Sequence, residues 1–187
     1  MKKVILFVLI ILFFTPTLLF SKEVAGIKIP DSITAGNTKL VLNGAGTRTK
    51  FFMKMYVGAL YLSESNSSPD KIIEADAPMA ITLHITSSLI TSERMEEATR
   101  EGFDNSTGGK TTAIANEIEK FISVFKEKIS EKDVYDLVYS PDKGVEVSKN
   151  QTLKVVIKGL EFKKALFGIW LCDKPAQKSL KKEMLGK

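Results

Sequence analysis

This 187-residue chain contains three arginines, and all of its other permanently charged basic side chains are lysines. The arginines are therefore the first side chains to consider for chemistry. Arg94 and Arg100 fall in a predicted helix, where Glu96 and Arg100 have the spacing of an ordinary surface ion pair. Arg48 instead precedes an apolar run that begins at Phe51. A permanently charged guanidinium beside such a run must reach water, pair with a carboxylate or bind a ligand. Arg48 is therefore a candidate anion-binding residue, with a structural or surface ion pair as the alternative.

Tyr56 is the second candidate, because it shares a face with Arg48 if Thr47 to Leu62 form one long strand. Both side chains can then look into one cleft. Eight residues of straight strand separate them by roughly 26 Å, however. We therefore expect Arg48 and Tyr56 to cooperate only if the strand bends or bulges strongly.

The sequence offers few residues for nucleophilic catalysis, metal binding or nucleotide binding. The single histidine, His84, lies on the polar side of a predicted strand and is expected to be half-exposed. The single cysteine, Cys172, follows Trp170 and is interpreted as a small buried residue. No Cys pair or HExxH pattern offers zinc ligands, and Gly44–Gly46 is too short for a nucleotide loop. We interpret that glycine pattern as a turn where another backbone passes closely, and we expect no metal and no cofactor.

The N-terminus has the pattern of a secretory signal. Lys2 and Lys3 precede an apolar run from Val4 to Phe14, and Ser21 is a small residue at a plausible cleavage point. The sequence predicts a signal peptide over residues 1–21, one domain over residues 22–187, and a protein exported to the periplasm. The alternative is an uncleaved N-terminal membrane anchor.

The net charge of +5 belongs to the ends of the chain, because residues 22–173 together carry −1. Nucleic-acid binding requires a clustered basic surface, so we expect none. Lys174, Lys178, Lys181, Lys182 and Lys187 make the last segment basic. Contact between a C-terminal helix and an anionic membrane surface is one interpretation, and a solvated helix face is the other.

Hydrophobic periodicity predicts one α+β domain, since strands come first, helices follow and strands then resume. A helix capped by Thr91 or Ser92 is expected before the stop at Asn105–Gly109. The other expected helices cover 112–129, 159–169 and 176–185, and the expected strands cover 25–29, 39–42, 47–62, 79–86, 134–139, 145–148 and 152–157.

Two early segments, Asn43–Arg48 and Lys50–Leu62, resemble the signature of the chalcone isomerase-like family, in its bacterial exported branch. The resemblance extends over nearly all of residues 23–186, including Val24–Asp31, Glu101–Asn105 and Ala165–Leu171; its first and last blocks are specific and the middle ones are weaker. The resemblance implies an open-faced β-sandwich, in which a large antiparallel sheet is backed by a helical layer and the ligand cleft lies between them.

Members of this family either cyclise an α,β-unsaturated ketone or bind fatty acids, and both branches place an arginine from this strand in the cleft. Arg48 matches that arginine. Tyr56 falls where the isomerases carry a threonine that helps polarise the ketone.

Three functions therefore remain open. The first is binding of a small apolar anionic ligand, most simply a fatty-acid-like carboxylate, with Arg48 as the anion clamp and Tyr56 beside it. The second is an isomerase, an intramolecular lyase that uses Arg48 and Tyr56 on an enone. The third is a structural or partner-binding envelope protein whose cleft is filled by its own side chains. Ligand binding requires an open volume of roughly 300 Å³ or more next to Arg48.

Overall fold

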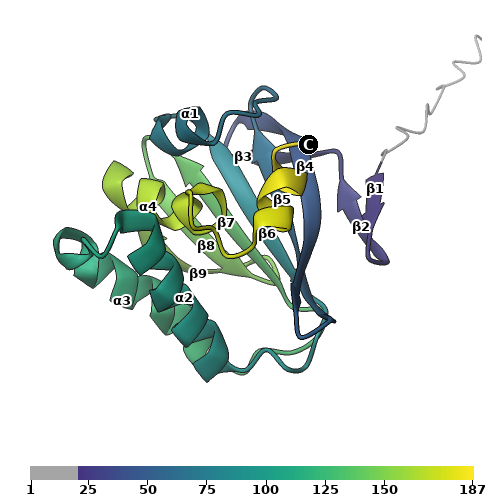
Figure 1. The fold of residues 1–187 in the computed structure, drawn as a ribbon. Helices are drawn as coiled ribbons and strands as arrows, with labels where there is room; N and C mark the ends of the chain where they lie inside the picture. Colours follow the sequence, from purple (N-terminus) through teal and green to yellow (C-terminus); the bar gives the residue numbers. More distant parts are fainter. Residues whose placement is uncertain (1–20) are drawn as a thin grey trace, which may run out of the picture.

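A seven-stranded antiparallel sheet forms the body of the computed structural model, which describes residues 21–187 (Figure 1). Each strand pairs with its neighbours in sequence, in the order β3-β4-β5-β6-β7-β8-β9. The strands are β3 (Ser32–Ala35), β4 (Thr38–Lys50), β5 (Met53–Leu62), β6 (Met79–Ile85), β7 (Val134–Ser140), β8 (Gly144–Lys149) and β9 (Thr152–Ile157). The predicted signal peptide lies outside the described residues except for Ser21.

A separate hairpin of β1 (Ser21–Val24) and β2 (Ile27–Pro30) precedes the sheet. The predicted strand at 25–29 was therefore wrong at its start, because Ala25 and Gly26 form the turn between β1 and β2 with positive φ angles.

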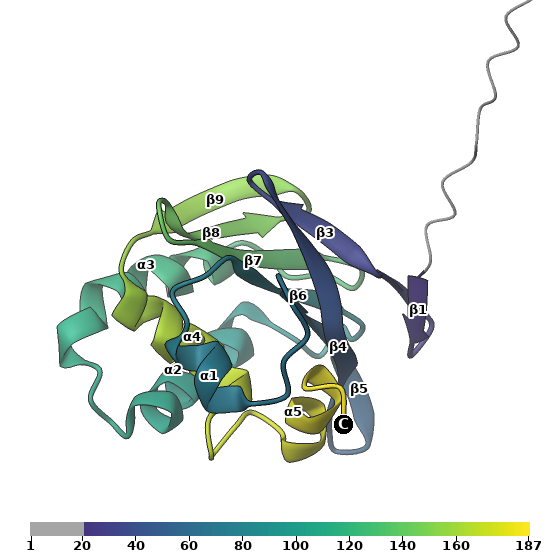
Figure 2. The ribbon, with the colours of Figure 1, turned by 90° about the horizontal axis from the view of Figure 1, so that it is seen from above.

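The helices gather on one face of the curled sheet (Figures 1 and 2). They are α1 (Pro69–Glu74), α2 (Ser92–Thr107), α3 (Ala115–Ser123), α4 (Leu160–Leu171) and α5 (Lys178–Met184), with short 3-10 turns at Thr112–Ile114 and Val124–Lys126. This arrangement confirms the predicted α+β class, a large antiparallel sheet backed by a helical layer. The predicted helix at 112–129 is broken into three pieces and ends at Lys126.

The ends of α2 follow directly from its sequence. The Thr91 side chain accepts a hydrogen bond from the backbone N–H of Arg94, as predicted for a capping residue. Gly108 ends the helix in the left-handed conformation that glycine adopts without strain. The helix continues through Asn105 and Ser106 to Thr107, so the predicted stop at Asn105–Gly109 began three residues too early.

Two apolar cores lie on opposite faces of the sheet. The larger core packs helices against strand residues such as Ile81 and Leu83. The smaller core lies on the other face, where Ile29 from β2 packs near residues of β4, β5 and β6. Strand β6 was expected to bury one face only, but Ala80 on its second face is fully buried as well. The curl of the sheet and the β1–β2 hairpin provide this extra cover.

Helix α5 lies against β4, where the glycines of the Asn43–Arg48 segment allow close approach (Figure 2). A Cβ atom at Gly44 would overlap the backbone carbonyl oxygen of Glu183, and one at Gly46 would overlap the Glu183 side chain. The predicted close approach of another backbone is therefore confirmed, although the glycines lie within a strand and not in a turn.

None of the helices within residues 21–187 combines the length and the apolar content needed to cross a bilayer.

Candidate ligand-binding site

The apolar run from Thr47 to Leu62 is a hairpin and not one long strand. Strand β4 ends at Lys50, Phe51 and Phe52 form a tight turn, and β5 begins at Met53. The expected separation of Arg48 and Tyr56 was therefore wrong, since the turn brings the two residues directly opposite each other in the register of the sheet. Directly opposed residues have Cβ atoms about 5 Å apart.

A β-bulge at Met55 also shapes this part of the hairpin. Arg48 pairs with Tyr56 while Thr49 pairs with Lys54, so Met55 is the extra residue on β5. Bulges re-aim side chains and are common beside functional sites. Both Met55 and Tyr56 line the same cavity, which strict alternation along a strand would not allow.

Arg48 is held in place by neutral groups. Its Nη1 atom donates one hydrogen bond of 3.0 Å to the backbone carbonyl of Thr49 and another of 3.0 Å to Oε1 of Gln177. Gln177 precedes α5 and also accepts from the Thr49 backbone N–H. Within residues 21–187 no carboxylate forms an ion pair with Arg48. The guanidinium therefore has N–H groups left for an anion.

Tyr56 is partly buried beside Arg48. Its hydroxyl oxygen accepts a hydrogen bond of 3.0 Å from Nε1 of Trp170 on α4. Burial raises the pKa of Tyr56, and the Trp170 hydrogen bond and the Arg48 charge offset only part of that rise. The hydroxyl is therefore neutral at physiological pH, and its proton remains available to an acceptor in the cavity.

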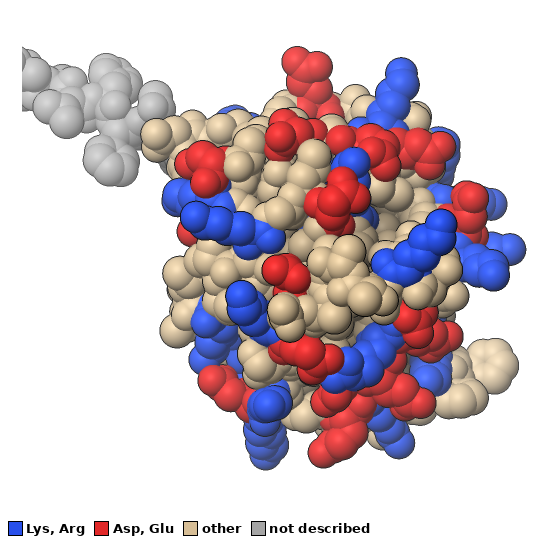
Figure 3. All heavy atoms as spheres, turned by 90° about the vertical axis from the view of Figure 1, so that its left-hand side faces the viewer, with Lys and Arg blue, Asp and Glu red and all other residues tan. Residues whose placement is uncertain are grey.

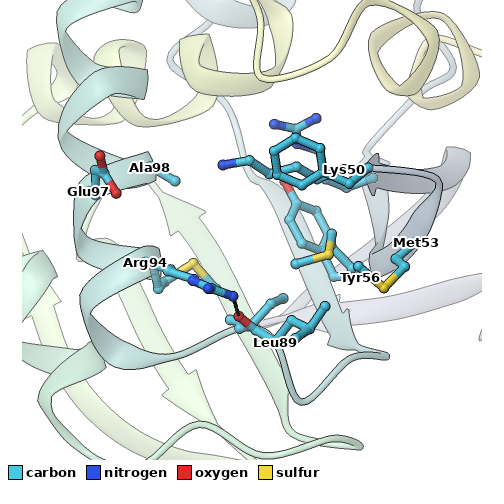
Figure 4. Close-up of a pocket in the computed structure, with 12 residues that line it drawn as sticks. Lys50, Met53, Tyr56, Leu89, Arg94, Glu97 and Ala98 are labelled. Carbon is cyan, nitrogen blue, oxygen red and sulfur yellow. Dashed lines mark hydrogen bonds between the residues drawn. The ribbon is translucent and has the colours of Figure 1, made fainter.

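Two adjacent cavities meet at Arg48 and Tyr56. The outer cavity has a volume of about 470 Å³ and opens between the β4–β5 hairpin and α2 (Figure 4). The inner cavity, of about 130 Å³, reaches between the sheet and the helices toward Phe121, Phe125 and Trp170. Arg48, Tyr56, Met95 and Ala98 line both cavities.

Most of the outer wall is apolar. The side chains that provide this apolar surface are Phe51, Met53, Met55, Leu89, Ile90, Met95 and Ala98. Thioether side chains are flexible, so the methionines can adapt to ligands of different shape. The volume exceeds the roughly 300 Å³ that a small-molecule ligand requires.

Arg94 is a residue of this cavity that the sequence assigned to a helix surface. It lies across the outer cavity from the hairpin, and its Nη1 atom donates a hydrogen bond of 2.9 Å to the carbonyl of Leu89 (Figure 4). Lys50 also lines the cavity, and Glu97 is the only acidic residue of its wall. Three cations against one carboxylate give the opening an electrostatic preference for anions. The spacing of residues in the sequence does not indicate that Arg94 lines this cavity, because the cavity forms between segments that are far apart in the chain.

The remaining candidates have structural roles. His84 is half-buried on β6, as expected, and burial lowers its pKa. Cys172 is only partly buried and ends α4. The predicted pair between Glu96 and Arg100 is confirmed, and Arg100 also contacts Glu119 at 2.6 Å. Among residues 21–187, no cluster of His, Cys, Asp or Glu side chains has the makeup of a metal site.

Acidic and basic side chains alternate over the face shown in Figure 3, without a broad continuous basic area. On this face the charge pattern differs from that of a nucleic-acid-binding surface, which concentrates positive charge.

Comparisons with known proteins identify the fold and the family. No curated protein is similar enough in sequence to count as a match. A crystal structure of a fatty-acid binding protein from Arabidopsis thaliana is similar in fold, with a TM-score of 0.67 and 19% sequence identity. The alignment covers 86% of this chain and 92% of the plant protein. The sequence also matches the family described as chalcone isomerase-like over residues 21–186, which is almost the whole described chain. This protein therefore belongs to the chalcone isomerase-like family.

Proposed function

We propose that this protein binds an apolar carboxylate, such as a fatty acid, with Arg48 as the anion clamp. The observation that carries the proposal is a guanidinium with no carboxylate partner among the described residues, placed where an open apolar cavity of about 470 Å³ meets a smaller one. Charge-assisted hydrogen bonds between a guanidinium and a carboxylate are stronger than neutral ones and are often bidentate. The apolar wall then accommodates the hydrocarbon chain.

The other groups of the site fit this ligand. Gln177 and the Thr49 carbonyl fix one end of the guanidinium, so little side-chain freedom is lost when an anion binds. Tyr56 presents its hydroxyl beside Arg48, and Arg94 and Lys50 attract anions toward the cavity. The structural similarity to a fatty-acid binding protein supports the same class of ligand.

A titration followed by tryptophan fluorescence tests the proposal. Trp170 is the only tryptophan of the chain, and it lines the inner cavity and hydrogen-bonds Tyr56. We expect palmitate to change the emission of Trp170 with saturation at one molecule per chain. Native mass spectrometry on the same samples should show one added palmitate. The proposal fails if neither method detects palmitate or fatty acids of other lengths.

A second candidate is cyclisation of an α,β-unsaturated ketone, because the hairpin brings Arg48 and Tyr56 into register. Arg48 would hold the reacting phenolate while the Tyr56 hydroxyl donates to the ketone oxygen. The test is loss of chalcone absorbance above the spontaneous rate, measured for the protein and for Arg48→Ala. A rate equal to the spontaneous one, or an equal rate in the variant, removes this candidate. The third possibility, a cleft filled by the protein's own side chains, is disfavoured by the open volume beside Arg48.

We also propose that the protein is exported and that cleavage after Ser21 leaves the domain in the periplasm. The charged, then apolar, then small-residue order of residues 1–21 supports this. Intact-mass measurement of the protein from the periplasmic fraction should give a chain that begins at Lys22. Recovery of the uncleaved chain from membranes would favour the anchor instead.

A further inference from the structure

The turn between β4 and β5 has residues that its geometry does not favour. Lys50 pairs with Met53, so Phe51 and Phe52 alone form a two-residue loop. Their φ angles are 51° and 64°, in the left-handed region. Loops of this kind prefer Asn-Gly, since a bulky side chain with positive φ is strained. The local backbone therefore does not explain two phenylalanines here.

The hydrophobic core does not explain them either. Phe51 is 78% exposed and Phe52 is 106% exposed, and the next residue, Met53, is 45% exposed. All three lie on one short hairpin tip, which we define as residues 50–54. An exposed apolar cluster of this kind marks an interaction surface. Strain that persists without a folding benefit also points to a function.

The charges around the tip identify its partner. Lys50 and Lys54 flank the apolar residues, Arg48 lies just behind, and residues 47–57 contain no carboxylate. A bilayer interface has the same two-part chemistry, because aromatic side chains enter the boundary of the acyl region while lysines reach anionic headgroups. A protein groove that accepted the phenylalanines would need acidic residues placed around it in addition.

We propose that the hairpin tip inserts into the surface of an anionic lipid bilayer. Phe51 and Met53 also line the outer cavity, so insertion brings the mouth of that cavity to the membrane surface. The basic C-terminal helix is less suited to the same task. Helix α5 buries its apolar residues Leu180 and Met184 against the rest of the fold. Its exposed surface therefore carries lysines but offers no apolar face to a bilayer.

A double variant separates membrane docking from folding. F51N/F52G replaces the aromatic pair with the dipeptide that this turn prefers. We expect its Tm to rise by a few degrees, because the strain is relieved. The experiment uses residues 21–187, the part of the chain that the structure describes, and vesicles of phosphatidylglycerol and phosphatidylcholine or of phosphatidylcholine alone.

The wild-type domain should float with the anionic vesicles and bind phosphatidylcholine vesicles much more weakly. F51N/F52G should lose at least tenfold in partitioning to the anionic vesicles, and K54Q should lose severalfold. Leu153→Ser is the matched control, since Leu153 is 53% exposed on β9, away from the hairpin, and its replacement should leave flotation unchanged.

Three results would overturn the proposal. The first is equal flotation of F51N/F52G and wild type, and the second is no flotation of wild type with anionic vesicles. The third is a wild-type dimer in sedimentation that F51N/F52G abolishes, because the tip would then contact a second copy of this chain. Docking does not depend on the proposed ligand. Vesicle flotation without palmitate binding would therefore contradict the proposed function and leave the membrane-docking proposal standing.

Discussion

Replacing Lys163 with methionine should destabilise the protein and also change how its stability depends on pH. Lys163 lies on α4 and its side chain is fully buried. Its Nζ atom donates hydrogen bonds to the carbonyls of Ile72, Ile73 and Ala75, at 2.9, 2.8 and 2.7 Å. These carbonyls belong to the C-terminal end of α1, where a helix lacks internal partners.

The size of the effect at pH 7 follows from two opposing contributions. Lys163→Met leaves three carbonyls without their donor, and each unsatisfied buried group costs about 1–3 kcal/mol. Removal of a buried charge recovers up to about 3 kcal/mol, because burial lowers the pKa of Lys163 from 10.5 to about 8. The three groups together cost about 3–9 kcal/mol, so after that recovery we expect a net loss of up to about 6 kcal/mol in the free energy of unfolding, with a central value of about 3 kcal/mol.

The pH dependence has a definite sign. Below pH 8 the lysine is charged in both the folded and the unfolded chain, so folding carries the full cost of burying the charge. Between pH 8 and 10.5 the folded protein releases this proton while the unfolded chain keeps it, so the free energy of unfolding rises with pH. Above 10.5 both states are neutral. Lys163→Met should lack this rise.

Urea denaturation followed by circular dichroism at pH 7 and at steps up to 10.5 measures both effects. Lys164→Met is the matched control, because Lys164 forms exposed ion pairs with Glu74 and Glu161. That variant should lose much less stability than Lys163→Met and keep the wild-type slope below pH 10. A Lys163→Met protein as stable as wild type at pH 7, or with the same slope above pH 8, would refute the reasoning.

Three further predictions concern the hairpin, the site and α2. Gly44→Ala should lower the free energy of unfolding by about 1–3 kcal/mol in urea denaturation, because its Cβ displaces Glu183 and with it α5; no loss would contradict that packing. Tyr56→Phe removes the acceptor of the Trp170 N–H and should shift tryptophan emission to shorter wavelength, whereas an unchanged spectrum argues against the hydrogen bond. Thr91→Ala should cost about 1 kcal/mol in thermal unfolding through loss of a helix cap, and Thr91→Ser should restore most of it.

Elements with a clear period were predictable from the sequence, because the period itself reports which face is buried. The alternation of Ile81, Leu83 and Ile85 located β6, and the predicted cap at Thr91 or Ser92 located the start of α2. Strand β9 was predicted with its observed bounds. In each case local preference and tertiary packing favour the same structure.

The hairpin at Phe51 and Phe52 was not predictable, since phenylalanine is not a turn residue and an unbroken apolar run indicates one strand. That error also separated Arg48 from Tyr56, which the turn brings together. Arg94 was missed for a different reason. Arg94 lines the cavity only because the hairpin and the loop at Leu89 lie next to α2 in the folded chain. A local sequence pattern carries no information about that arrangement.

The most direct test of the account compares palmitate with cetyl alcohol, a ligand of equal chain length without the charge. Arg48→Met should weaken palmitate binding by roughly 10- to 100-fold, the equivalent of about 1.5–3 kcal/mol, and leave the alcohol nearly unchanged. Arg100→Met is the matched control, because Arg100 pairs with Glu96 and Glu119 and does not line either of the two cavities at Arg48. That variant should bind both ligands as wild type does. Equal losses for acid and alcohol in Arg48→Met, or no loss for either, would contradict the assignment of Arg48 as the anion clamp.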